Sequence, residues 1–85
     1  KKFKEADARL NRVYKELASK LEGDAPGRLK LVEIAWTKYR DDNCDFEASR
    51  FEGGSMRPLI YSSCMERMTR ARTAELREQS KEREQ

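Results

Sequence analysis

The two cysteines of the chain, Cys44 and Cys64, lie ten residues on either side of Gly54. If the segments that flank Gly53 and Gly54 are helices folding back on each other, residues equidistant from the bend face one another. Each cysteine would then lie about 15 Å from the turn, within bridging reach if the Cβ vectors converge. The spacing therefore predicts a disulfide across an antiparallel helical hairpin, the alternative being two small buried thiols. Because disulfides persist mainly outside the cytosol, we expect an exported protein.

Catalytic and metal-binding chemistry has few candidate residues. The chain has no histidine, which removes the commonest general base and the commonest metal ligand. Ser55 follows two glycines at an expected helix N-terminus, where backbone amides could bind an oxyanion, but an ordinary N-cap is the simpler interpretation. The run from Asp41 to Asp45 lacks the ligand spacing and central glycine of a calcium loop. We therefore expect no catalytic residue, no metal and no cofactor, in a protein that is not an enzyme.

Acidic side chains gather on the segment that leads into the glycine turn. Such a patch beside a protruding loop would steer a cationic partner electrostatically, although it could equally be a solvated helix face. Glu47 belongs to the same cluster. The turn, held by the nearby disulfide, is the most pre-organised contact surface, and the turn at 23–27 is second. The predicted partner-binding residues are Asp41, Asp42, Asp45, Glu52, Gly53, Gly54, Ser55 and Arg57.

Arginines on the third expected helix are a weaker candidate, for an anionic polymer. Arg67, Arg70 and Arg77 project along one side of that helix, but glutamates are interspersed and no aromatic residues interleave to stack on bases. The net charge of +3 is mixed in sign throughout the chain. We expect a solvated face here and no nucleic-acid partner.

Length and patterning predict the elements that must position these residues. A chain of 85 residues, 41% of them charged, makes one small domain with a thin core. Apolar residues at three- and four-residue steps predict a three-helix, all-α domain over residues 1–76, with helices at about 3–22, 26–51 and 56–76. Residues 77–85 have no apolar face and are expected to be a polar helical extension or a frayed tail. No apolar run is long enough for a membrane span.

The apolar periodicity also predicts which face each helix buries. On the first helix the stripe is clean, and its expected members are Phe3, Ala6, Leu10, Val13, Tyr14, Leu17 and Leu21. On the second, an arc centred on Trp36 is expected to be buried, and it comprises Leu29, Val32, Trp36, Tyr39, Phe46 and Phe51. Arg40, Asn43 and Glu47 share this arc, so they must reach water or pair internally. On the third, the expected stripe is Ile60, Tyr61, Cys64, Met68 and Ala71.

Three segments resemble the N-terminal domain of the LprI-type lysozyme inhibitors. The segment 6–17, ADARLNRVYKEL, resembles the opening helix of that family, and 35–44, AWTKYRDDNC, resembles its central signature. The glycine turn followed by Cys64 and by 69–76, TRARTAEL, is similar to its closing portion. The resemblance covers nearly the whole chain.

The resemblance implies a small bacterial domain that is periplasmic, secreted or lipid-anchored, and that inhibits lysozyme. The chain begins with Lys-Lys-Phe, so we expect it to be a mature or trimmed fragment of an exported protein. The function expected is a non-enzymatic envelope protein that binds and inhibits lysozyme or a related wall hydrolase. The alternative is a structural or adaptor module that docks onto another envelope protein.

Overall fold

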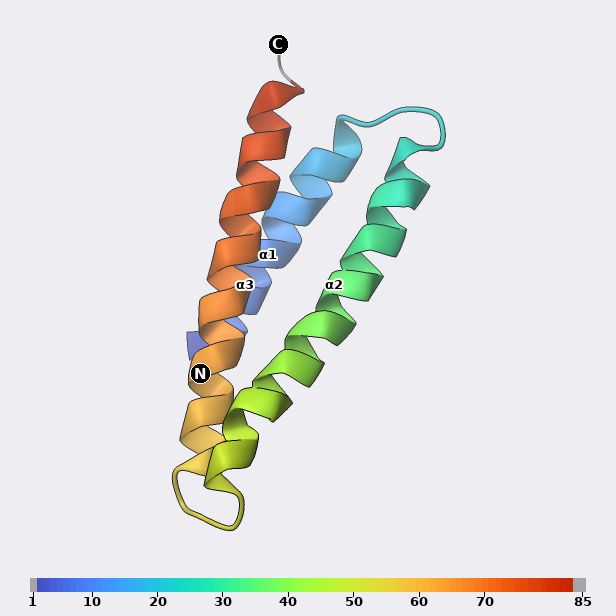
Figure 1. Cartoon of the computed structure of the whole chain (residues 1–85). Coiled ribbons are helices and arrows are strands. Elements are labelled where there is room, and N and C mark those ends of the chain that lie inside the picture. Colours follow the sequence, from blue (N-terminus) through green and yellow to red (C-terminus); the bar gives the residue numbers. More distant parts are fainter. Residues whose placement is uncertain (1, 84–85) are drawn as a thin grey trace.

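The computed structural model describes residues 2–83 as three α-helices (Figure 1). They are α1 (Lys2–Ser19), α2 (Ala25–Ala48) and α3 (Arg57–Glu82), and a short 3-10 helix, η1 (Ser49–Phe51), follows α2. No strand occurs among the described residues, so the all-α prediction is confirmed. The molecule is elongated, with extents of 48 × 20 × 16 Å. No helix within 2–83 is long and apolar enough to cross a membrane.

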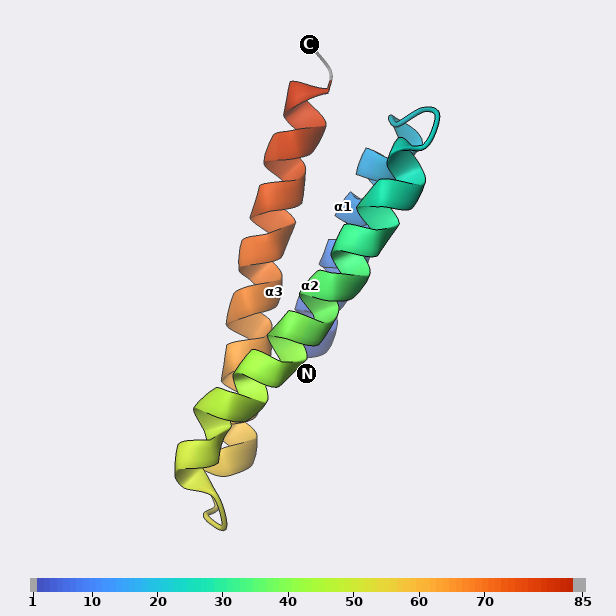
Figure 2. The same ribbon diagram turned by 45° about the vertical axis from the view of Figure 1, so that its right-hand side comes forward.

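The helices are arranged around α3, which packs along α1 and against α2. α2 runs antiparallel to both (Figure 1). Two views show that α2 and α3 converge at the turn that joins them and diverge toward the opposite end (Figures 1 and 2). The fold is thus a tight α2–α3 hairpin with α1 laid along α3.

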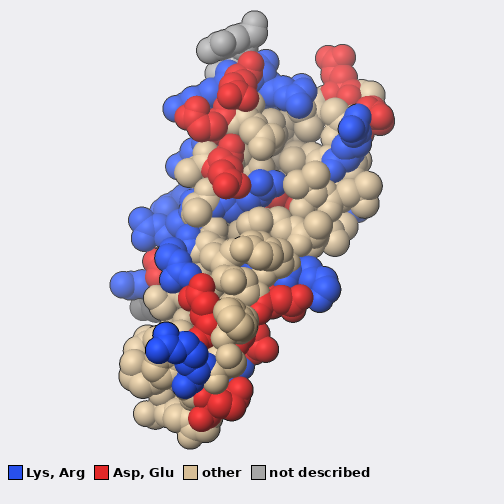
Figure 3. All heavy atoms as spheres, viewed as in Figure 1, with Lys and Arg blue, Asp and Glu red and all other residues tan. Residues whose placement is uncertain are grey.

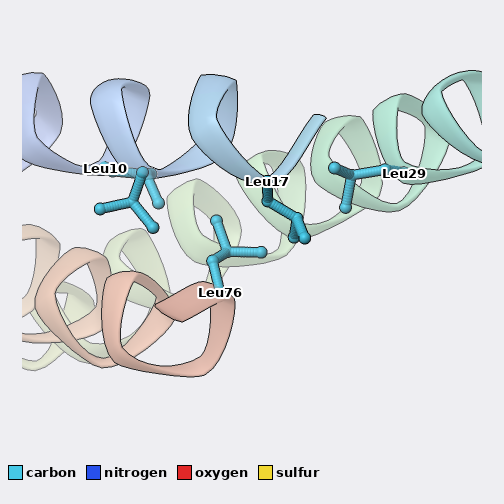
Figure 4. Close-up of a cluster of buried hydrophobic side chains, with 5 residues drawn as sticks. Leu10, Leu17, Leu29 and Leu76 are labelled. Carbon is cyan, nitrogen blue, oxygen red and sulfur yellow. The ribbon is translucent and has the colours of Figure 1, made fainter. Parts of the chain in front are cut away.

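The apolar core lies where all three helices contribute side chains. Leu10 and Leu17 of α1, Leu29 of α2 and Leu76 of α3 point toward one another (Figure 4). Val13 completes this cluster of buried residues. The stripe expected on α1 is confirmed at its centre, because Ala6 and these α1 residues are buried. Tyr14 and Leu21 are half-buried beside the core.

The turn residues partly follow the predicted chemistry. Gly23 has a φ of +63°, a backbone conformation that favours glycine, and Pro26 lies in the first turn of α2. Asp24 occupies the N-cap position, but its side chain makes no capping hydrogen bond. The N-cap of α3 is Met56, again without a side-chain cap, so the prediction that Ser55 caps this helix is wrong. Both helices begin without the expected side-chain acceptor.

The buried face of α2 differs from the one predicted. Val32, Tyr39 and Phe46 are exposed, whereas Arg40 and Cys44 are buried. Both sides of this helix carry apolar residues, so the apolar periodicity alone could not decide which side packs. The disulfide decides it, because residues four positions apart lie on the same side of a helix. The buried residues of α2 are Leu29, Arg40, Cys44 and Ala48.

The buried stripe of α3 is more polar than predicted. Cys64 is buried as expected, but Ala71 is exposed, and Ile60 and Met68 are only half-buried. Polar residues replace them because α3 must contact α1 as well as α2, which turns a different side inward. The buried residues of α3 are Cys64, Met65, Thr69, Arg72, Thr73, Leu76 and Ser80.

The polar segment that follows Leu76 continues α3 without a break to Glu82. Ser80 in this segment is buried, and its hydroxyl receives a hydrogen bond of 2.6 Å from the ammonium of Lys20. The end of α1 and the end of α3 are therefore connected by a polar contact, beyond the last buried apolar residue of α3, Leu76.

Two arginines lie inside the middle of the molecule, on either side of half-buried Trp36. Arg40 lies 5.2 Å and Arg72 6.0 Å from a Trp36 ring centroid, distances typical of cation–π contacts. Arg72 also donates to Glu33 at 3.1 Å and Glu75 at 3.0 Å. Arg40, which shares the predicted arc of α2, is therefore buried and paired internally, whereas Tyr39 is exposed, so the prediction that it is buried is wrong.

Candidate functional site

The most constrained surface element is the end of the α2–α3 hairpin, residues 44–64, which we call the hairpin tip. The predicted disulfide between Cys44 and Cys64 closes it, with a Cα–Cα distance of 5.5 Å. Both cysteines are buried, and they pack with Met65 and Met68. The disulfide thus acts as a small apolar core for a part of the molecule that extends beyond α1 (Figure 1).

The turn inside the hairpin tip has a defined backbone. η1 tightens the chain after α2, and Gly53 then adopts a φ of +79°. The amide of Gly54 donates to the carbonyl of Phe51 at 2.9 Å, and a Cβ at Gly54 would lie only 3.3 Å from that oxygen. Gly53 provides a conformation that other residues rarely adopt, and Gly54 provides room for the carbonyl. The two glycines therefore set the shape of the turn.

Ion pairs fasten the turn to the two helices. The guanidinium of Arg57 contacts Asp45 at 2.5 Å and Glu52 at 3.0 Å. The hydrogen bond to Asp45, and the charge of Glu52 with it, raise the pKa of Arg57 above its ordinary value. Farther along the hairpin, Arg67 donates to both carboxylate oxygens of Glu47. This bond is the main reason that the pKa of Glu47 is lowered.

The predicted acidic cluster is therefore largely neutralised within the molecule. Asp41 contacts Arg40 at 2.9 Å, and Asp42 contacts Lys38 at 2.8 Å, a bond that raises the pKa of this lysine. With Asp45 and Glu52 held by Arg57, each of these four carboxylates has a cationic neighbour. Acidic and basic side chains alternate over the lower half of the molecule (Figure 3). Any steering by this surface is short-ranged, because opposite charges cancel at a distance.

The predicted residues do not all lie together. Asp45, Glu52, Gly53, Gly54, Ser55 and Arg57 belong to the hairpin tip, and of these Asp45 and Glu52 meet at Arg57. Asp41 and Asp42 lie before the disulfide on α2, and Asp41 contacts Arg40 there. The structure thus separates a compact group at the turn from two aspartates farther up the helix.

Sequence reasoning missed the cross-links between the helices. Arg67 was assigned to a solvated arginine face, yet its contact with Glu47 connects α3 to α2. Symmetry about the turn does not predict this pair, because Glu47 lies seven residues and Arg67 thirteen residues from Gly54, and the long arginine side chain spans the offset. Within residues 2–83 no group of three or more acidic or cysteine side chains is arranged to hold a metal ion.

Fold and site together define a small, disulfide-closed three-helix domain with an exposed, rigid hairpin tip. The profile of the family described as "Lysozyme inhibitor LprI" matches residues 1–76. The chain belongs to this family. It is 36% identical over 89 aligned residues to the uncharacterized protein R02472 of Rhizobium meliloti (strain 1021). The match covers 89% of this chain and 64% of that protein. No solved structure matches significantly.

Proposed function

We propose that this chain is a non-enzymatic protein of the cell envelope that binds and inhibits lysozyme or a related wall hydrolase. The membership of the LprI family supports inhibition as the activity. The disulfide between Cys44 and Cys64 supports an oxidising location, which is periplasmic or secreted.

The hairpin tip is the contact surface in this proposal. An inhibitor that enters a substrate cleft gains affinity when its inserted segment is already in the bound conformation. The disulfide, the two glycines of the turn and the contacts of Arg57 supply such pre-organisation. Gly53 and Ser55 are exposed at its end. This pre-organised turn is the main support for assigning the contact surface to the hairpin tip.

The charge pattern supports recognition by shape and by short-range contacts. A cationic hydrolase would gain little from long-range attraction, because the net charge of the chain is +3 and the acidic side chains near the turn are paired. Side-chain carboxylates of Asp45 and Glu52 remain 68% and 70% exposed while they contact Arg57. They can therefore accept further hydrogen bonds from a partner at close range.

A cell-wall lysis assay tests the proposal. The oxidised protein is titrated against animal-type and goose-type lysozymes, and we expect saturable inhibition near stoichiometric ratios with at least one of them. A folded, disulfide-intact sample that inhibits neither enzyme at any ratio contradicts the proposed activity.

A matched pair of charge reversals tests the contact surface. Glu52→Lys changes an exposed glutamate of the hairpin tip, and Glu22→Lys changes an exposed glutamate of the turn at the opposite end. We expect Glu52→Lys to weaken inhibition about tenfold, the size of a central interface contact, and Glu22→Lys to leave it unchanged. Equal loss in both variants, or loss only in Glu22→Lys, would place the contact elsewhere.

A further inference from the structure

The outer side of α2 carries an apolar face that no part of the described chain covers. Leu31, Val32, Tyr39 and Phe46 are exposed by 69%, 53%, 61% and 74%. Figure 3 shows a largely uncharged surface over the upper half of this helix and acidic side chains along its lower half. Single exposed apolar residues are ordinary, but a contiguous set on one helix marks an interaction surface.

The spacing of these residues fits contact with another helix. Val32, Ala35, Tyr39 and Phe46 fall at the alternating three- and four-residue steps of a heptad, and Asp42 occupies the position between the last two. We call these five positions the α2 seam. The seam lies on the side of α2 opposite the buried residues Arg40 and Cys44, because it is turned about half a revolution from them at 100° per residue. Tyr39, Asp42 and Phe46 are therefore free to receive a partner without disturbing the fold, and Val32 also lines a hollow between the helices.

Charges beside the seam favour one kind of partner and one direction. Lys38 lies in its amino-terminal half, and Asp42 and Asp45 lie in its carboxyl-terminal half. A second copy in parallel would oppose each of these charges to itself, which is unfavourable. An antiparallel copy instead brings Lys38 of one chain opposite Asp45 of the other.

The antiparallel arrangement that places Lys38 opposite Asp45 also matches the seam residues in size and polarity. It aligns Phe46 of one copy with Ala35 of the other, so that a large side chain meets a small one. It also aligns Tyr39 with Asp42, where a phenol hydroxyl can donate to a carboxylate. Each of these contacts occurs twice, as an isologous two-fold interface requires.

We propose that two copies of this chain associate through antiparallel packing of their α2 seams. The proposal is independent of the inhibitor function, although the seam ends at Phe46, on the α2 arm of the hairpin tip. It places the two hairpin tips at opposite ends of the dimer and leaves their turns at Gly53–Ser55 outside the seam contacts. Such a dimer would present two tips at once, and a partner fixed on a surface could be bound with added avidity.

Analytical ultracentrifugation of the oxidised chain over a wide concentration range tests the association. We expect a monomer–dimer equilibrium, and we expect Phe46→Glu to raise the dissociation constant at least about tenfold because it buries a charge at the seam. Ile34→Glu is the matched control, since Ile34 is 58% exposed on the same helix but faces the groove beside Tyr14, outside the seam. A wild-type chain that stays monomeric at millimolar concentration overturns the proposal, as does equal weakening by both variants.

A charge exchange tests the direction. Lys38→Glu and Asp45→Lys, made separately, each place like charges opposite one another, and each should raise the dissociation constant several-fold. The double variant restores opposite charges and should recover the wild-type value. In a parallel pair the double variant would still oppose like charges, so failure to recover would overturn the antiparallel arrangement. Circular dichroism of each variant verifies that the helices are intact, since Asp45 also contacts Arg57.

Discussion

The two ends of this molecule are stabilised in different ways. At the hairpin tip, α2 and α3 are joined by the Cys44–Cys64 disulfide and by the contacts of Arg57 and Arg67. At the opposite end α2 diverges from α3, and residues of all three helices surround a hollow of about 460 Å³. Leu17, Leu21 and Leu29 line this hollow. The hairpin tip is held by covalent and ionic links, whereas the open end combines apolar packing with the hydrogen bond between Lys20 and Ser80.

The difference shows how a thin core is divided along an elongated bundle. Most of the buried aliphatic side chains lie toward the open end, in the cluster around Leu17 and Leu76. The cluster at the hairpin tip buries only the two cysteines and Met65, with Phe3, Tyr61 and Met68 half-buried against them, which is little apolar surface to hold two helices together. The disulfide substitutes for a core there, so the surface proposed to bind a partner depends on the oxidation state of the protein.

The largest effect should come from removing the link at the hairpin tip. Cys44→Ala combined with Cys64→Ala opens a loop of about twenty residues, and we expect the free energy of unfolding to fall by about 3 kcal/mol. Urea denaturation followed by circular dichroism measures this loss. Wild-type protein treated with a reductant should match the variant. If the variant is as stable as the oxidised wild type, the hairpin tip is held by its ion pairs instead.

A smaller loss should follow from weakening the open end. Leu29→Ala removes a buried side chain beside the hollow, and we expect a cost of about 2 kcal/mol, at the lower end for such changes because the neighbouring helix can move inward. Leu31→Ala, at an exposed position two residues later, should change the stability by less than about 0.5 kcal/mol. Similar losses in both variants would mean that the splayed part of α2 is not packed as described.

The sequence was sufficient to predict the helices and the disulfide, because both depend on local spacing. It did not suffice for the buried face of α2. Apolar residues occupy both sides of this helix, and Val32 and Phe46, which were predicted to be buried, are exposed. The buried side is filled instead by Arg40, whose charge is satisfied by Thr69 and Asp41 and by aromatic rings. Periodicity counts apolar residues and cannot foresee a buried cation that finds partners on other helices.

The candidate site was predictable in position but not in its electrostatics. Symmetry about Gly54 located the turn, and Asp45 and Glu52 do lie beside it. The partners of these acids come from the start of α3, and Arg57 is the residue that joins them. A composition-based reading counts such carboxylates as a negative patch, because only the packed hairpin reveals that a guanidinium lies between them.

Alanine substitutions at two glycines, one at each end, compare a position that requires a positive φ with one that does not. Gly53→Ala forces a residue with a side chain into a φ of +79°, and we expect a cost of about 1 kcal/mol. Gly27→Ala, in the first turns of α2 with open space around it, should instead stabilise the protein by about 0.5 kcal/mol. Thermal unfolding of the two variants gives the comparison. A loss in both would indicate that Gly27 also needs its conformational freedom.

Acid should release the hairpin tip by a smaller amount than any of these substitutions. Because the hydrogen bond from Arg67 lowers the pKa of Glu47, the ionised carboxylate stabilises the folded state at pH values above its ordinary pKa of 4.5. This contribution is lost as the pH falls through the lowered folded-state pKa. The difference in stability between wild type and Glu47→Gln should therefore be present near pH 7 and shrink as the pH falls below 4.5. Glu78→Gln, at an exposed position of α3 away from the hairpin tip, is the control, and it should change the stability little near pH 7. If the stability difference between wild type and Glu47→Gln does not change with pH, the contact between Glu47 and Arg67 does not stabilise the hairpin. The disulfide would then be the main link between α2 and α3 near Glu47.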